Sequence, residues 1–191
     1  IDAGFVPLLD AAPLVIAREM GFAAEEGLEL VLHSEPSWAA LRDRLIWGGY
    51  DAAQMLAPVV IAQNAGIGAG DAALDALMVL SVNGDVLGTT PALAEAIAQA
   101  CGDFRDAAAT GRALAAATGG RPLRFGVPFP LSTHAALVDC WLPEAVGALV
   151  TVPPPRMARA IAGGEIDAFC VGEPWGSVAV DAGAAQLILP G

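Results

Sequence analysis

The sequence contains no lysine. All nine of its basic residues are arginine, and they stand against 21 acidic residues, which gives a net charge of −12 over 191 residues. Lysine supplies the Schiff-base amine and the phosphate-binding residue of P-loops, so its absence excludes both kinds of site. The acidic balance also argues against nucleic acid and anionic membrane surfaces as partners, because both attract clustered cations.

Cysteine, histidine and long apolar runs are also scarce. Cys101, Cys140 and Cys170 lack CxxC spacing, and an odd number cannot pair fully, so we expect no disulfide framework. His33 and His134 have no partner at metal-ligand spacing, so we expect no metal and no cofactor. No GxSxG elbow is present, so we expect no catalytic residues and no enzyme. The apolar runs are interrupted before about 20 residues, so we expect no membrane insertion.

What is present is an alternation of strand-like and helix-like segments. Strands are expected within 1–10 and at 28–33, 51–56, 74–84, 123–129, 148–152, 166–171 and 186–190. Helices are expected at 10–27 with Asp10 as N-cap, 37–48 with Ser37 as N-cap, 58–66, 91–100, 104–118, 132–142, 153–164 and 177–184. This alternation is typical of an α/β protein with mostly parallel sheets.

One local pattern occurs twice, as "GGYDAAQMLAP" and "GGEIDAFCVGEP". In each copy a helix ends in Gly-Gly, a strand follows, and a proline comes seven residues after the aspartate. Ligands of open α/β sheets bind beyond the carboxyl ends of strands, where helix N-termini offer N–H groups. Two such corners favour two lobes around a cleft, and a single doubly wound domain is the alternative.

Several unusual side chains fall at the expected strand-to-helix corners. A cleft would gather these residues, although each has a plainer interpretation alone: Trp38 as a core aromatic, Asn83-Gly84 as a simple turn, His134 in a capping turn. The predicted ligand-binding residues are Trp38, Met55, Asn83, Gly84, Asp85, Thr133, His134, Glu173 and Trp175.

The stretches "SWAALRDRL", "DAAQMLAP", "PFPLSTH" and "VPPPRMARAIAGGEIDAFCVGEPW" resemble the nitrate- and bicarbonate-binding proteins of ABC importers. They are equally similar to the related cytoplasmic nitrate/nitrite sensor. The resemblance covers nearly the whole chain and implies the two-lobed type II periplasmic-binding-protein fold, with mixed, mostly parallel sheets flanked by helices. We expect lobe I at 1–82, lobe II at 83–172 and a return to lobe I at 173–191.

By this resemblance, Trp38 and His134 line an anion pocket. Asn83-Gly84-Asp85 stands where many transporter members have Asn-Gly-Gln, and a carboxylate there repels nitrate unless it is protonated, turned away or paired with a cation. Family members also continue past "GEPW" and supply a lysine from that later segment. We therefore expect a C-terminally truncated chain.

The resemblance implies capture of a small oxyanion, nitrate or nitrite first, for an ABC importer, with permease subunits as partners and a periplasmic location. One alternative is a cytoplasmic sensor that acts on a regulatory protein, and a secretion leader would separate the two. Another is a bicarbonate-binding protein, with Asp85 and Glu173 near a divalent cation. A related enzyme of thiamine-pyrimidine synthesis is disfavoured because it relies on lysine.

Overall fold

A computed structural model describes residues 1–68, 70–142 and 146–190. The chain forms two compact units, residues 1–82 (unit 1) and 83–191 (unit 2), and each is described by itself below. The division falls where the sequence placed the end of lobe I. No helix in the described ranges combines the length and apolar character needed to cross a membrane.

Unit 1 is built on a three-stranded parallel sheet in the order β2-β1-β3. The strands are β1 (Asp2–Phe5), β2 (Val31–Ser34) and β3 (Ala52–Ala53). The expected strands at 28–33 and 51–56 are therefore present but shorter. Because all three strands run in the same direction, their carboxyl ends meet at one edge of the sheet.

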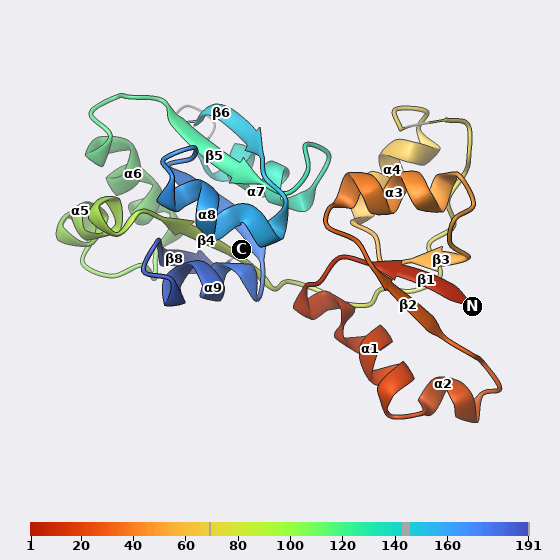
Figure 1. The fold of residues 1–191 in the computed structure, drawn as a ribbon. Helices are drawn as coiled ribbons and strands as arrows, with labels where there is room; N and C mark the ends of the chain where they lie inside the picture. Colours follow the sequence, from red (N-terminus) through yellow and green to blue (C-terminus); the bar gives the residue numbers. More distant parts are fainter. Residues whose placement is uncertain (69, 143–145, 191) are drawn as a thin grey trace. The chain divides into compact units, whose positions relative to one another are not determined.

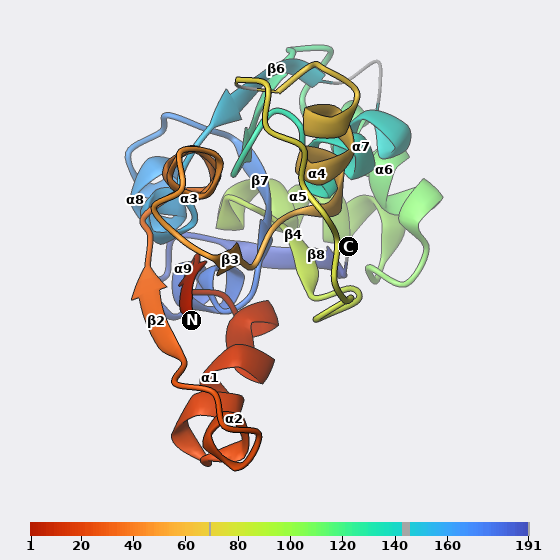
Figure 2. The ribbon, with the colours of Figure 1, turned by 90° about the vertical axis from the view of Figure 1, so that its right-hand side faces the viewer.

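Helices cover both faces of this sheet. Figure 1 and Figure 2 show α3 (Trp38–Ile46) and α4 (Ala57–Asn64) on one side and α1 (Ala12–Glu19) and α2 (Phe22–Glu25) on the other. The prediction of one helix over 10–27 was wrong, because Gly21 has a φ of 82° and separates α1 from α2. Asp10 is not an N-cap: it lies inside a short 3₁₀ helix, η1 (Leu9–Ala11).

Helix α3 lies unusually close to the central strand of unit 1. A Cβ atom built on Gly4 of β1 would lie 2.4 Å from Leu41 Cδ1 and 2.6 Å from the Tyr50 ring. Any larger residue at position 4 would therefore displace the Leu41 or Tyr50 side chain from its place against β1. Ser37 caps the first turn of α3 as predicted, with its hydroxyl accepting a hydrogen bond from Ala40 N at 3.2 Å.

The expected strand at 74–84 was wrong. Residues 72–81 form neither helix nor strand, and the side chains of Leu77, Met78 and Val79 are exposed. Asn64 holds the start of this segment through two hydrogen bonds of 2.8 Å with the backbone of Leu74. An apolar run becomes a strand only where a neighbouring strand supplies ladder partners, and here no described strand pairs with it.

Unit 2 contains a five-stranded mixed sheet in the order β6-β5-β7-β4-β8. Its strands are β4 (Asp85–Thr89), β5 (Leu123–Val127), β6 (Val146–Thr151), β7 (Ala168–Gly172) and β8 (Gln186–Pro190). Strand β4, which the sequence analysis missed, runs antiparallel to both β7 and β8. The expected return of 173–191 to the first lobe is therefore corrected, since β8 completes the sheet of unit 2.

Side chains of unit 2 alternate between two cores, one on each face of its sheet. Along β7, Ala168 and Cys170 enter one core, while Phe169 and Val171 enter the other. The first core packs against α5 (Pro91–Cys101), α6 (Ala107–Ala117) and α7 (Thr133–Trp141). The second packs against α8 (Met157–Ala162), which follows the 3₁₀ helix η2 (Pro154–Arg156), and α9 (Trp175–Asp181).

Candidate functional site

A few side-chain nitrogens inside the described part of the chain are buried and make no hydrogen bond. They are Nε1 of Trp38, Nε2 of Gln54, and Nδ1 and Nε2 of His134. Burying a polar group without a partner costs free energy of about 1–3 kcal/mol, so most such groups are paired in folded proteins. Unpaired donors of this kind are therefore candidates for ligand contacts.

Trp38 is the first residue of α3, directly after its Ser37 cap, and it is only 1% exposed. The close packing of α3 on β1 holds the indole in the protein, yet its N–H has no acceptor. Trp38 was predicted to bind ligand, and its surroundings are compatible with that role.

Gln54 directly follows β3 and was missed by the sequence analysis. Its Oε1 accepts a hydrogen bond from Val6 N at 3.2 Å, whereas its Nε2 is buried without a partner. The signal for this residue was a lone amide side chain at the carboxyl end of the short apolar strand in "DAAQML". Met55, the neighbouring residue that was predicted, is half-buried.

A polar network in unit 1 was also missed. The buried Glu35 carboxylate accepts a hydrogen bond from Tyr50 Oη and pairs with Arg44 Nε at 3.1 Å. Burial, followed by the hydrogen bond with Glu35, raises the pKa of Tyr50, while Arg44 opposes this shift. The ring of His33 stacks on Tyr50, and its Nε2 lies 2.6 Å from Asp2 Oδ1. The groups in this network satisfy one another, so it serves to hold the segments around α3.

In unit 2, the structure brings Asp85 and His134 together. His134 lies in the first turn of α7, which Ser132 caps by accepting a hydrogen bond from Ala135 N at 3.1 Å. His134 is 2% exposed, and its Nε2 is 2.8 Å from Asp85 Oδ1. The distance is that of an ion pair, although neither ring nitrogen forms a hydrogen bond within the described residues. The carboxylate that the sequence placed at an anion site thus faces an imidazole.

The turn before β4 and the segment after β7 lie side by side. Asn83 and Gly84 have φ values of 67° and 93°, the positive values expected for this turn. Gly84 O accepts a hydrogen bond from Glu173 N at 3.0 Å. The Glu173 carboxylate in turn accepts hydrogen bonds from Ser177 N and Ser177 Oγ, both at 3.0 Å, at the start of α9. Four of the predicted residues, namely Gly84, Asp85, His134 and Glu173, are therefore linked by these two sets of contacts in unit 2.

The other predicted residues of unit 2 are less informative. Thr133 is exposed at the first position of α7, and Trp175 is half-buried at the first position of α9. Burial and then the charge of Asp85 raise the pKa of the Cys170 thiol, which keeps it protonated rather than nucleophilic. Within the described ranges, no three His, Cys, Asp or Glu side chains form a group that could hold a metal ion.

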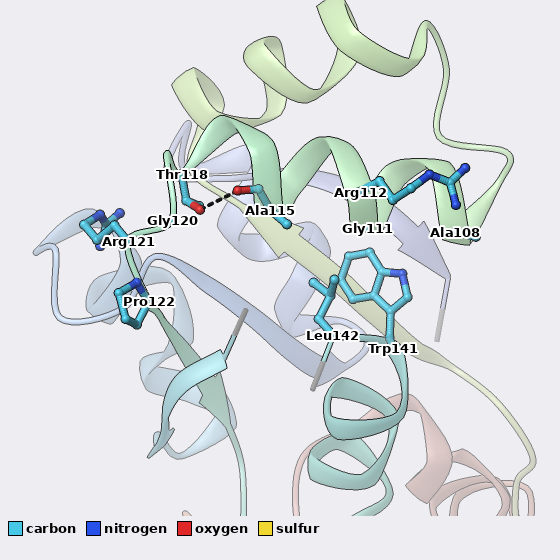
Figure 3. Close-up of a pocket in the computed structure, with 10 residues that line it drawn as sticks. All are labelled: Ala108, Gly111, Arg112, Ala115, Thr118, Gly120, Arg121, Pro122, Trp141 and Leu142. Atoms are coloured by element: carbon cyan, nitrogen blue, oxygen red, sulfur yellow. Dashed lines mark hydrogen bonds between the residues drawn. The ribbon is translucent and has the colours of Figure 1, made fainter. Parts of the chain in front are cut away.

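Unit 2 also has a hollow of about 510 Å³ away from these residues. Figure 3 shows Trp141 and Leu142 beneath α6, where Gly111 leaves space for the indole, with Arg112 and Arg121 toward opposite ends. The indole N–H of Trp141 donates to Ala107 O at 2.7 Å, so it is not available for a ligand. None of the predicted site residues lines this hollow.

The fold defines an α/β protein of the periplasmic-binding-protein type. A crystal structure of the periplasmic nitrate-binding protein NrtA from Synechocystis matches with a TM-score of 0.84 and 27% sequence identity, over 99% of this chain and 50% of that chain. The profile of the NMT1-like family matches residues 1–189, so the chain belongs to the NMT1-like family.

Two curated relatives extend this comparison. The nitrate import ATP-binding protein NrtC of Synechocystis is 37% identical over 98% of this chain and 28% of its own length. The bicarbonate-binding protein CmpA of Synechococcus is 30% identical over 100% of this chain and 45% of its own length. The chain therefore spans less than half of either relative.

Proposed function

We propose that this chain is part of a solute-binding protein that captures a small oxyanion, nitrate or nitrite first, for an ABC importer. The observation that carries the proposal is that each unit holds buried side-chain nitrogens without a hydrogen bond: those of Trp38 and Gln54 in unit 1, and those of His134 in unit 2. An oxyanion accepts hydrogen bonds through every oxygen, so it is the complement of such donors. The relatives that bind or import nitrate and bicarbonate support the same class of ligand.

The proposed binding needs no lysine. Hydrogen bonds from indole, amide and imidazole N–H groups stabilise an anion once water is excluded, because their dipoles act in a medium of low dielectric constant. Proposed roles follow for the predicted residues: Trp38 and His134 donate, while Met55, Asn83, Gly84, Thr133 and Trp175 shape the surroundings. We propose permease subunits of the importer as partners, a periplasmic location and no enzymatic activity.

Bicarbonate is the second candidate, and Asp85 favours it. A carboxylate oxygen accepts a hydrogen bond from the hydroxyl of bicarbonate but has nothing to accept from nitrate. The sequence analysis paired Asp85 and Glu173 near a divalent cation. In the structure Asp85 lies against His134 and Glu173 against Ser177, so a cation would have to displace existing contacts.

The deciding experiment is calorimetric titration of the purified full chain with nitrate, nitrite and bicarbonate, each with and without calcium. We expect saturable binding of nitrate or nitrite that does not depend on calcium. Binding of bicarbonate alone would instead select the second candidate, and its dependence on calcium would show whether a cation takes part. No binding in any titration would contradict the proposal.

The residues are tested by Trp38→Ala and His134→Ala. Each removes an unpaired donor, and we expect the loss of at least about 1.5 kcal/mol of binding free energy, or more than tenfold in Kd, for each. Trp47→Ala is the matched control, because Trp47 is 77% exposed just after the same helix. Unchanged affinity in both site variants would exclude these two residues from the site.

A further inference from the structure

We infer that Gln54 binds the ligand directly, as an amide donor presented by unit 1 to acceptor oxygens of the bound anion. This inference rests on the proposed function. It adds a residue that the sequence analysis did not predict. It also states the interaction of this residue, which is a hydrogen bond from the amide NH₂ group to an oxygen of the ligand.

The hydrogen bond from Val6 N determines which end of the Gln54 amide is the oxygen. The two ends of a glutamine side chain are told apart by their hydrogen-bond partners. Val6 N–H can only donate, so the atom that faces it at 3.2 Å must be the amide oxygen. Gln54 N also donates to Gly4 O at 3.0 Å, which holds the backbone of this residue against β1. The NH₂ group is therefore the end left without a partner.

Burial makes the unpaired NH₂ group costly. Gln54 is only 3% exposed, and no acceptor within the described residues reaches its Nε2. A side chain whose only purpose was to cap Val6 N would not need a second polar end inside the protein. A ligand oxygen that accepts from Nε2 would remove the cost of about 1–3 kcal/mol.

The topology of unit 1 places Gln54 where ligands bind in parallel sheets. Val6 follows β1, Trp38 begins α3 shortly after β2, and Gln54 follows β3, so all three lie beyond the carboxyl ends of neighbouring strands. Trp38 Nε1 is likewise a donor without acceptor capacity. Trp38 and Gln54 thus each carry a buried N–H donor without a partner, and an acceptor oxygen of a ligand such as nitrate or nitrite would satisfy either donor.

The test is Gln54→Glu in the purified full chain, titrated with nitrate and nitrite. Glutamate keeps the shape and an oxygen for Val6 N but replaces the NH₂ donor with an anionic acceptor. We expect a loss of affinity of about tenfold to a hundredfold. Gln54→Met, which removes the donor without adding charge, should lose about tenfold. Gln186→Glu, at an exposed position of β8, adds the same charge elsewhere and should bind like the unsubstituted protein.

The outcomes separate the inference from the function on which it rests. If the unsubstituted protein binds and both Gln54 variants bind equally well, Gln54 is not a ligand and the inference is overturned while the function stands. If the unsubstituted protein binds none of the three anions, the function fails and the inference with it. If the variants do not fold, the inference is tested in the unsubstituted protein, by following the NMR signal of the Gln54 side-chain amide. It should shift on addition of nitrate while that of Gln186 stays, and an unmoved Gln54 signal contradicts the inference.

Discussion

The pair formed by Asp85 and His134 bears on the proposed anion binding at the scale of single residues. The carboxylate lies 2.8 Å from the imidazole, and by the resemblance described above Asp85 stands where many transporter members have glutamine. A protonated imidazole beside it makes the pair neutral overall, whereas a neutral imidazole leaves a full negative charge. In either case the carboxylate opposes an approaching anion, and the other donors must outweigh it.

We predict that Asp85→Asn raises the affinity for nitrate about tenfold, because removing one negative charge near the ligand lowers the electrostatic penalty by roughly 1–4 kcal/mol. Calorimetry at pH 7 measures the change. Asp139→Asn, an exposed position on the same helix as His134, changes the net charge equally and should leave the affinity as it was. Weaker nitrate binding by Asp85→Asn would show instead that the carboxylate supports the donor role of His134.

At the level of elements, the ends of strands and helices are held by specific side chains. Ser37 and Ser132 cap α3 and α7, and these caps place Trp38 and His134 in first turns. Asp167 joins the starts of β5 and β7: it accepts hydrogen bonds from Arg124 N at 2.9 Å, Arg124 Nε at 3.1 Å and Arg121 Nη2 at 3.2 Å. Burial alone would raise the pKa of Asp167, but hydrogen bonds from Arg124 and Arg121 lower it well below its usual range.

We predict that Asp167→Asn lowers the free energy of unfolding by about 1–3 kcal/mol at pH 7. Because the folded-state pKa is depressed, this contribution is complete above the unfolded-state pKa of about 4 and is lost as the pH falls further. Urea denaturation at pH 7 and below pH 4 should show the difference shrinking in acid. Asp103→Asn is the control, since its pair with Arg105 is highly exposed and should contribute less than about 1 kcal/mol. A difference that persists in acid would contradict this account.

The two units differ as whole bodies. Unit 2 contains both extended apolar cores, which sandwich its five-stranded sheet. Unit 1 has a small sheet and carries most of the exposed large apolar side chains, among them Leu77, Met78 and Val79 at 72–82% exposure.

We predict that residues 83–191 expressed alone unfold cooperatively, because both cores lie within them, whereas residues 1–82 alone do not. Thermal melting followed by far-ultraviolet circular dichroism distinguishes a sigmoidal transition from a gradual one. A cooperative transition for residues 1–82 would show that unit 1 is stable by itself, and its absence for residues 83–191 would show that the two cores of unit 2 do not suffice for cooperative folding. Either result would contradict the prediction.

Much of the fold follows from local sequence. The helix cap at Ser37, the turn at Asn83-Gly84 and the strand at 186–190 were predicted because each depends on a few neighbouring residues. The apolar run at 74–84 has strand composition yet pairs with no described strand, and β4 was missed because glycine and polar residues weaken its pattern. In both cases, hydrogen bonding with a strand distant in the sequence determines whether the segment becomes a strand.

The sequence by itself determined the α/β class, the family resemblance, the corners that carry Trp38 and His134, and the absence of lysine chemistry. Only the tertiary structure decided that Asp85 faces His134, that β8 completes the sheet of unit 2, and that Gln54 keeps an unpaired NH₂ group inside unit 1. The physical reason is the sequence separation over which each kind of interaction acts. Caps, turns and periodicity act over a few residues, whereas strand order and the pairing of buried polar groups join positions that lie about 50 to 100 residues apart.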